Sequence, residues 1–154
     1  MKKIFATLAL CVMTLAASAQ VKSIDIKGDL RHDFGLGVGV TTDLTDNIEF
    51  SPAANFYFGD GTNLQFEADF HYKFDLGDDF TLYPIVGGGL NFSHYKIEIL
   101  GEEESDTSLD FLVNLGCGVQ KQLTDNLAGF VECKYQWCGG GGDTYFSLGV
   151  KLDL

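Results

Sequence analysis

Hydrophobic and polar residues alternate with period two along most of the chain after residue 20. Between residues 64 and 76 every even position is apolar and every odd position is polar. Because successive side chains on a β-strand point to opposite faces, this pattern predicts a strand with one apolar and one charged face. The same alternation predicts eight strands and no helix. The strands span residues 22–30, 34–44, 48–58, 64–76, 80–92, 109–123, 127–137 and 144–154.

Three of the connections share one type of sequence. Residues 45–47, 77–79 and 124–126 are turn formers that lie between two apolar residues. Asn and Asp tolerate the left-handed conformation of a three-residue hairpin turn, so we expect three tight turns of this kind. The turn at 124–126 then opposes residues whose numbers sum to 250, which brings apolar residues opposite apolar residues.

The other connections, at 31–33, 59–63, 93–108 and 138–143, are acidic or rich in glycine and vary in length. Outer-membrane barrels likewise have tight turns at one end and longer loops at the other. An even number of strands places both ends of the chain at the end with the tight turns.

Alternation is compatible with two barrels that are inside-out versions of each other. In a soluble eight-stranded barrel the apolar rows point inward around a small apolar ligand, whereas in a membrane barrel they face lipid. Across the second to eighth strands the polar rows carry eleven charged residues and the apolar rows carry one, Lys121. Lys121 is four residues from Asp125, so its amine could extend to the interface. A charge in mid-bilayer costs about 2–4 kcal/mol, so this distribution favours the membrane barrel.

Glycines and aromatic residues support the same orientation. The polar rows contain many glycines, which we expect to face long charged side chains in a lumen that side chains just fill. Aromatic residues gather near both ends of the strands, as in the belts at membrane interfaces. The glycines are Gly35, Gly37, Gly39, Gly87, Gly89, Gly116, Gly118 and Gly149. The aromatic residues are Phe50, Phe74 and Phe80 near the tight turns and Phe34, Phe56, Phe58, Phe92, Phe111, Trp137 and Phe146 near the loops.

The N-terminus predicts export. Lys2 and Lys3 precede an apolar stretch from 4 to 17, and Ala17-Ser18-Ala19 has the small-x-small pattern of a cleavage site. We therefore expect residues 1–19 to be a cleaved signal peptide and residues 20–154 to form an all-β, eight-stranded antiparallel up-and-down transmembrane β-barrel. The net charge of -12 argues against a nucleic-acid partner, which would require a basic face.

The polar rows predict many charges inside the barrel. Buried charges must be paired and hydrogen-bonded, so we expect a network of internal ion pairs; the alternative is a proton or ion pathway. Eight strands leave no open aqueous channel, which favours the network. The predicted inward charged residues and histidine are Glu67, Asp69, His71, Lys73, Asp75, Glu132, Lys134, Lys151, Asp153, Asp43, Glu49 and Asp110.

Catalytic chemistry is poorly supported by the sequence. His32 and His94 fall in loops, and the neighbouring Ser93 should point to the face opposite His94. An acidic run between 102 and 106 contains oxygen ligands but no metal-site spacing. We predict no catalytic, cofactor-binding or metal-binding residues, and no enzyme.

Cys117 and Cys133 are predicted to lie directly opposite each other on the last hairpin but one. An oxidising compartment permits a disulfide bond, yet directly opposed strand cysteines make strained bonds, which favours free thiols. Cys138 has no predicted partner.

The order of several short motifs resembles the small outer-membrane β-barrel family of the opacity-protein and OmpA-transmembrane type, as found in Bacteroidetes-like Gram-negative bacteria. The motifs are Leu123-Thr124-Asp125-Asn126-Leu127 and its counterpart at 44–48, residues 81–84 with the glycines 87–89, residues 114–119 and residues 147–150. The resemblance covers 22–154. It implies insertion by the outer-membrane assembly machinery and no shared catalytic residues. Two features depart from the family: the final residue is Leu154 rather than an aromatic one, and the first strand is short and charged, with Asp25, Lys27 and Asp29. Separately, Pro52 and Pro84 suggest local bulges.

We therefore expect a monomeric outer-membrane barrel, not a porin, with periplasmic termini and a structural or adhesin-like role through its extracellular loops. Its expected partners are outer-membrane lipid, the assembly machinery and a surface ligand bound by loop 93–108. The two alternatives are a soluble barrel that binds a small apolar ligand and a lipid-modifying enzyme at the rim of the loops.

Overall fold

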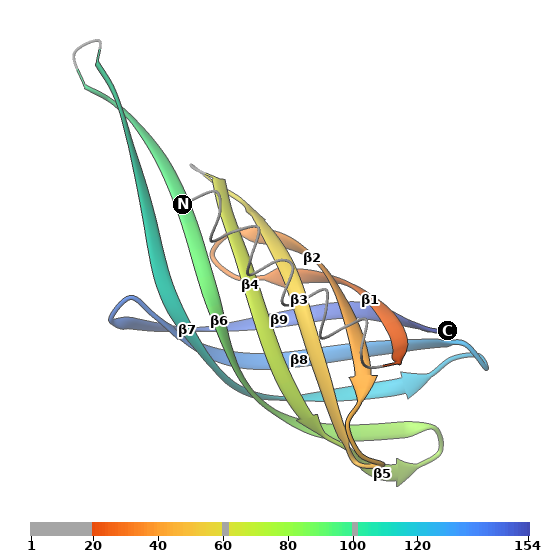
Figure 1. The fold of residues 1–154 in the computed structure, drawn as a ribbon. Coiled ribbons are helices and arrows are strands. Elements are labelled where there is room, and N and C mark those ends of the chain that lie inside the picture. Colours follow the sequence, from red (N-terminus) through yellow and green to blue (C-terminus); the bar gives the residue numbers. More distant parts are fainter. Residues whose placement is uncertain (1–19, 60–61, 100–101) are drawn as a thin grey trace.

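The computed structural model describes residues 20–59, 62–99 and 102–154, so the predicted signal peptide and its cleavage site lie outside the described residues. Nine strands occur in the described part of the chain, and they wind into the tilted barrel shown in Figure 1. Their bounds are β1 Val21–Leu30, β2 Phe34–Asp43, β3 Ile48–Phe58, β4 Thr62–Tyr72, β5 Phe74–Gly77, β6 Phe80–Ile99, β7 Glu102–Gln122, β8 Leu127–Cys138 and β9 Gly141–Asp153.

The described residues contain no helix that is long and apolar enough to cross a membrane.

The sheet closes on itself. Its strand order is β4-β3-β2-β1-β9-β8-β7-β6-β5, and β4 also pairs with β6. Lys73 separates β5 from β4, so these two segments together count as one of the eight antiparallel strands of the barrel wall. Each of these eight strands pairs with its neighbours in the sequence, and β1 pairs with β9 to close the barrel. The predicted eight-stranded up-and-down barrel is confirmed.

Two of the tight turns have the predicted register. The amide of Leu44 donates to the carbonyl of Ile48 at 2.8 Å, and that of Leu123 donates to Leu127 at 2.8 Å. Cys117 accordingly lies opposite Cys133. Val21, at the start of β1, and Leu154 lie at the same end of the barrel as these turns, where the amide of Leu154 donates to the carbonyl of Lys22.

The third tight turn differs from the prediction. Gly77 pairs directly with Phe80, which leaves only Asp78 and Asp79 in the turn, and their φ angles are 53° and 66°. Positive φ at both central residues is the requirement of a type I′ turn. A register shift between Asp75 and Gly77 takes up the extra residue, since glycine adopts its φ of 79° without strain.

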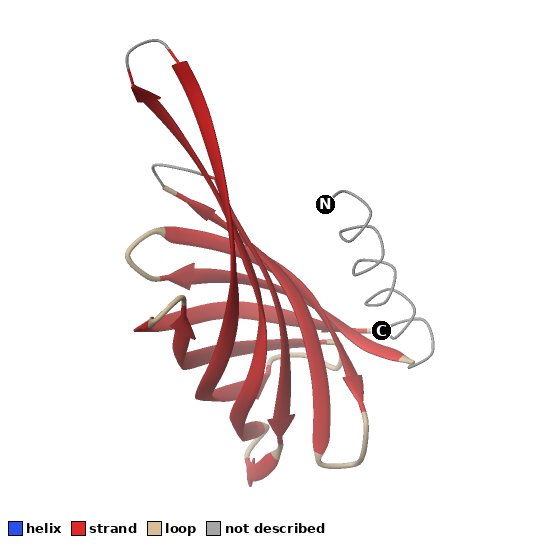
Figure 2. Ribbon diagram, turned by 60° about the vertical axis from the view of Figure 1, so that its left-hand side comes forward, coloured by secondary structure: helices blue, strands red, loops and turns tan. Residues whose placement is uncertain are grey.

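The predicted loops at 93–108 and 138–143 are wrong. Strands β6 and β7 remain paired as far as Ile99 and Glu102, and they form an arm beyond the barrel (Figures 1 and 2). At 138–143 only Gly139 and Gly140 form the turn, because both adopt the positive φ that a two-residue hairpin needs.

The two prolines do not create bulges. Pro52 pairs with Ala68 and Pro84 with Cys117, and the register on both sides of each pair is unchanged. A proline removes one hydrogen-bond donor from a ladder, but the neighbouring pairs keep the strands aligned. The predicted bulges are therefore wrong.

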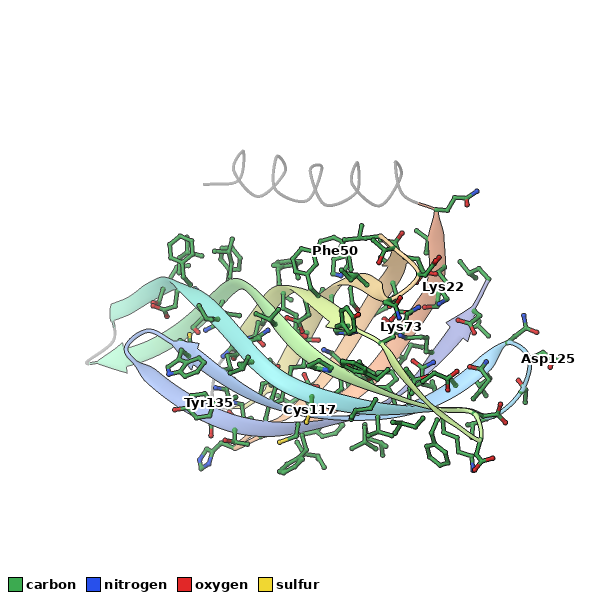
Figure 3. The ribbon with its side chains drawn as sticks, turned by 90° about the horizontal axis from the view of Figure 1, so that it is seen from below. Lys22, Phe50, Lys73, Cys117, Asp125 and Tyr135 are labelled. Atoms are coloured by element: carbon green, nitrogen blue, oxygen red, sulfur yellow. The ribbon has the colours of Figure 1, made fainter. Side chains whose placement is uncertain are left out.

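The two faces of the wall have opposite chemistry. Large apolar side chains of alternate residues are exposed on the outside, while the intervening polar side chains are buried within. Figure 3 shows the outer side chains standing away from the wall, Cys117 and Tyr135 among them. The alternative of a soluble barrel with an apolar interior is wrong, because most buried side chains of the interior are charged or polar and the large apolar side chains are exposed outside.

Candidate functional site

The barrel interior is the main polar site of the described residues, and glycines make room for it. Tyr57 pairs with Gly35, and a Cβ atom on that glycine would lie 2.7 Å from the tyrosine ring. Lys27, by contrast, passes beside Gly37, where a Cβ would lie 2.9 Å from its Cε. The inward glycines were expected to face charged side chains, and this is confirmed at Gly37. At Gly35 and Gly118, aromatic rings of neighbouring strands lie over the glycine instead. The flat rings need this space because the lumen of eight strands is narrow.

A network of three carboxylates and two lysines has Lys134 on β8 as its centre, and the sequence predicted this network only in outline. The ammonium lies 2.7 Å from Asp69, 3.1 Å from Glu67 and 3.6 Å from Glu132. Lys27 from β1 forms an ion pair with Glu67. These side chains are buried, so each charge depends on its partners for the stabilisation that water would otherwise provide.

Amide and hydroxyl groups complete the hydrogen bonding of this central cluster. The side-chain amide of Asn114 on β7 donates to Glu67 and to Asp69, both at 3.0 Å. The Tyr83 hydroxyl donates to Glu132 at 3.1 Å, and the Tyr145 hydroxyl donates to Glu67 at 3.3 Å. Side chains from β4, β6, β7, β8 and β9 are thereby joined across the lumen, and the predicted internal network is confirmed.

A second cluster lies at the mouth with the tight turns. The Glu49 carboxylate lies 3.1 Å from the ammonium groups of Lys22 and Lys73 and 3.4 Å from that of Lys151. The Lys73 ammonium also lies 3.0 Å from the Asp43 carboxylate. Figure 3 shows Lys22 and Lys73 near this end. Two of the lysines are partly exposed, so solvent screens this cluster more than the central one.

A break in the wall at Lys73 separates the lumen from the exposed β5 turn. The Lys73 amide donates to the carbonyl of Asn47 at 2.7 Å, outside the regular ladder. Beyond this break Asp75 is exposed, and its carboxylate accepts a hydrogen bond from the Gly77 amide at 2.9 Å. Asp75 pairs with Thr81, which is on the same row as the buried Tyr83, so Asp75 lies on the predicted inner row but at the mouth rather than within the closed lumen.

Arg31, which sequence reasoning missed, bridges β8 and β9 at the loop mouth and lines a pocket of about 150 Å³ there. Its guanidinium donates to the Asp143 carboxylate at 2.7 Å and to the side-chain amide oxygen of Gln136 at 2.8 Å. Partial burial opposes the charge, but the hydrogen bond to Asp143 raises the pKa of Arg31 above its ordinary value. The side-chain amide of Gln136 also accepts a hydrogen bond from that of Gln65 and donates one to that of Asn114, both at 2.8 Å. These bonds connect the mouth to the central cluster. Only the isolated position of Arg31 after an alternating strand could have indicated this role.

The centre of the lumen, below the pocket at the loop mouth, leaves little empty space. One cavity of about 20 Å³, lined by Asp25, His71 and Lys151 among others, lies within the lumen. About 10–15 Å³ of such space is needed for one water molecule, so this cavity holds about one. His71 is buried beside it and stacks on Tyr83 with 4.8 Å between ring centroids. The described barrel is plugged, and this favours a structural network over an ion pathway.

The residues considered for catalysis do not converge. Ser93 is buried and accepts a hydrogen bond from Asn91 at 3.0 Å, whereas Nδ1 of His94 lies 3.4 Å from the Thr107 hydroxyl. His32 is exposed in the loop at 31–33. Ser93 and His94 therefore point to opposite faces, as expected. No hydrogen bond between a serine and a histidine occurs among the described side chains.

Metal ligands do not gather in the described part of the chain either, since no group of three or more His, Cys, Asp or Glu residues could hold an ion there. The side chains of the acidic run at 102–106 lie outside the described residues. Cys117, Cys133 and Cys138 are free thiols, which agrees with the favoured interpretation of the opposed pair.

The chain matches no protein-family model and no curated protein by sequence. Its fold is nevertheless similar to solved outer-membrane barrels. The N-terminal β-barrel domain of Pseudomonas aeruginosa OprF is 19% identical, with a TM-score of 0.69 over 88% of this chain and 98% of that one.

Two further solved structures have the same fold. Yersinia pestis Ail, the attachment invasion locus protein, solved with the heparin analogue sucrose octasulfate, is 13% identical, with a TM-score of 0.57 over 87% of this chain and 97% of that one. The outer-membrane enzyme PagL is 15% identical, with a TM-score of 0.58 over 86% of this chain and 99% of that one. Identities this low carry the fold alone. The chain therefore has the fold of a small eight-stranded outer-membrane β-barrel.

Proposed function

We propose that the protein is an integral outer-membrane barrel that has no transport pore and interacts with a surface partner through the β6–β7 arm. Three features support this proposal: the apolar outer wall, the plugged lumen and the likeness to outer-membrane barrels. In this arrangement the chain ends and tight turns face the periplasm, the arm projects outside, and the protein acts as a monomer. The ion-paired interior also suits a structural role in the envelope.

The arm is the observation that carries this proposal. The last β4 partner of β6 is at His94, and the last β8 partner of β7 is at Leu112. Beyond these positions β6 and β7 pair only with each other among the described residues, which leaves the outer backbone edge of each strand without a neighbour. A free strand edge is a template for an extended partner.

The charge of the arm suggests the chemistry of its partner. Residues 95–110 contain six acids and one base, so the arm carries a net charge of about -5 by the ordinary ionisation of these groups. Ail was solved with a polyanion, but a polyanion would be repelled by this arm. We therefore propose a cationic, extended polypeptide as the surface ligand.

A catalytic role is not part of this proposal. PagL shows that a barrel of this fold can be an enzyme, but here Ser93 and His94 face opposite ways. We expect His94→Ala to leave the lipid composition of the outer membrane unchanged. Altered acylation of membrane lipid in that variant, measured by mass spectrometry, would contradict the non-enzymatic role.

The membrane location and the arm are tested separately. Folded protein should leave the membrane fraction only with detergent and should migrate differently on gels before and after heating. For the arm, residues 95–106 are replaced by Asn-Gly, because His94 and Thr107 are opposed and a two-residue turn closes such a pair. This shortened barrel should keep its heat-dependent migration but should lose binding to immobilised polylysine.

A matched variant separates charge from length. Glu102, Glu103 and Glu104 are changed together to Gln, which retains the whole arm. Binding of polylysine should weaken in this variant, and heparin should bind neither protein. Unchanged polylysine binding by the shortened barrel would contradict the proposed role of the arm, while extraction without detergent would contradict the membrane location.

A further inference from the structure

Lys121 differs from the other basic residues whose side chains the structure describes. Each of the others lies within ion-pair distance of a carboxylate, and these residues are Lys22, Lys27, Arg31, Lys73, Lys134 and Lys151. Lys121 has no carboxylate partner among the described side chains. It is exposed on the outer face of β7, and its ammonium lies 4.9 Å from the centroid of the Phe80 ring. The described side chains therefore supply no counter-anion to this cation, which is free to contact an anion from outside the chain.

An apolar groove on the outer wall begins beside Lys121. The groove has a volume of about 620 Å³ and is lined by Ile26, Val131, Leu148 and Val150, among others. Gly129 also lines it and lies directly opposite Lys121 in the β7–β8 ladder. Phe80 and Lys121 lie at the strand ends near the tight turns, and Leu148 lies in the middle of β9. The groove thus leads from a cation at the rim toward the middle of the wall.

We propose that this groove binds one phospholipid from the leaflet that surrounds the rim with the tight turns. The phosphate contacts the Lys121 ammonium, and one acyl chain lies along the groove over Gly129. This inference rests on the proposed membrane location. The arrangement provides a cation at the depth of the headgroup and an apolar surface at the depth of the chains.

A second copy of the barrel is a weaker match for the groove. Within the barrel wall, up to His94 in β6 and from Thr107 in β7, the outward rows of the described strands contain no carboxylate, so the wall of another copy would not neutralise Lys121. An apolar contact between copies would instead bury an unpaired ammonium, which is costly. A phospholipid supplies the missing charge and the hydrocarbon in one molecule.

Three variants separate charge from shape. Lys121→Gln removes the cation, Lys121→Arg retains it, and Gly129→Leu fills the groove. A Cβ atom at Gly129 would have its nearest neighbour, in Leu123, at 3.5 Å, which is ordinary contact, so the wall accepts a side chain there. The heat-dependent gel shift confirms that each variant has folded before any lipid is counted.

The experiment is native mass spectrometry of the full barrel released from detergent with added dioleoylphosphatidylglycerol. We expect one retained lipid on the original protein and on Lys121→Arg. Binding should be weaker by about tenfold or more in Lys121→Gln and Gly129→Leu, since a hydrogen bond to a charged group or a filled groove is lost. Dioleoylglycerol, which lacks the phosphate, should not be retained, and millimolar inorganic phosphate should not displace the phospholipid.

Several results would overturn the phospholipid site. Equal retention by all four proteins, retention of dioleoylglycerol, displacement by inorganic phosphate, or a dimer without bound lipid would each contradict it. These results would leave the membrane location intact. By contrast, a folded protein that remains in solution without detergent would overturn both the location and the site.

Discussion

The inner and outer faces of the barrel wall are built from neighbouring residues, yet they are stabilised in opposite ways. Inside, Lys134 and Glu67 are buried, and each depends on a specific partner from a distant strand. Outside, Leu148 and Val150 are exposed and need only an apolar surrounding. Because side chains alternate across a wall one residue thick, a shift of one residue exchanges the two environments. The comparison shows why charge is concentrated in one row and nearly absent from the other.

The largest effect should come from breaking the inner network at its centre. Lys134→Met leaves Glu67, Asp69 and Glu132 without their shared cation. Loss of one partner from a buried ionic cluster costs about 3–5 kcal/mol. Urea unfolding in lipid vesicles, followed by the fluorescence of Trp137, should show a free energy of unfolding lower by about this amount.

The control for this prediction removes charge on both sides. Combining Lys134→Met with Glu67→Gln and Asp69→Asn should restore part of the lost stability, because fewer unpaired carboxylates remain. A loss below about 1 kcal/mol in the single variant would show that water enters the centre and screens the cluster.

A charge on the outer face should have the next largest effect. Leu148→Arg places a guanidinium in the middle of β9 on the lipid side, where it costs about 2–4 kcal/mol. Leu154→Arg is the matched control, because Leu154 is at the end of the chain near the rim and the same charge there costs about 0–1 kcal/mol. Equal costs measured by unfolding in vesicles would contradict a lipid-facing wall.

A smaller effect should follow from filling the space beneath an inward tyrosine. In Gly118→Ala the new Cβ would lie 2.5 Å from the Tyr83 ring, so the ring must move away from Glu132. Overpacking of this kind costs about 1–3 kcal/mol. The control is Gly129→Ala on the outer face, where the new methyl group meets only ordinary contacts, so the unfolding free energy should change by less than about 1 kcal/mol. Equal destabilisation of the two variants would contradict the role of the inner glycine.

The smallest effect should be at the mouth with the tight turns. In Lys73→Met the Glu49 carboxylate keeps Lys22 and Lys151, and Lys73 itself is partly exposed. An ion pair in such a position contributes about 0–1 kcal/mol, and added salt should reduce even this amount. A loss as large as that of Lys134→Met, measured in the same urea titration, would remove the distinction between centre and mouth.

Period-two alternation was sufficient to predict the strands, the faces and most of the register. It also contained an unused signal for the arm, since Tyr95, Ile97 and Ile99 alternate with Lys96 and Glu98. The acidic run that follows made the segment resemble a loop, although a paired hairpin can carry acids on strands outside the barrel.

Other features depend on contacts between distant strands. Two partners of Lys134, Glu67 and Asp69, come from β4. The partners of Lys27 and Arg31 depend on how β1 joins β9 and on which strands face it across the lumen. No local pattern specifies the stagger at which a barrel closes, so the sequence predicted the network but not its pairs. The turn at Asp78 and Asp79 depended in the same way on the φ of Gly77, which spacing alone does not reveal.

The most direct test of the outward apolar face uses Trp137, the single tryptophan of the chain. Its side chain is 46% exposed on the outer wall at the loop end of β8 and packs on Tyr135 with 4.5 Å between ring centroids. In vesicles, lipids brominated near the top of the acyl chains should quench its fluorescence strongly, while aqueous iodide should have little effect. Strong quenching by iodide together with no response to brominated lipid would contradict a wall that faces hydrocarbon.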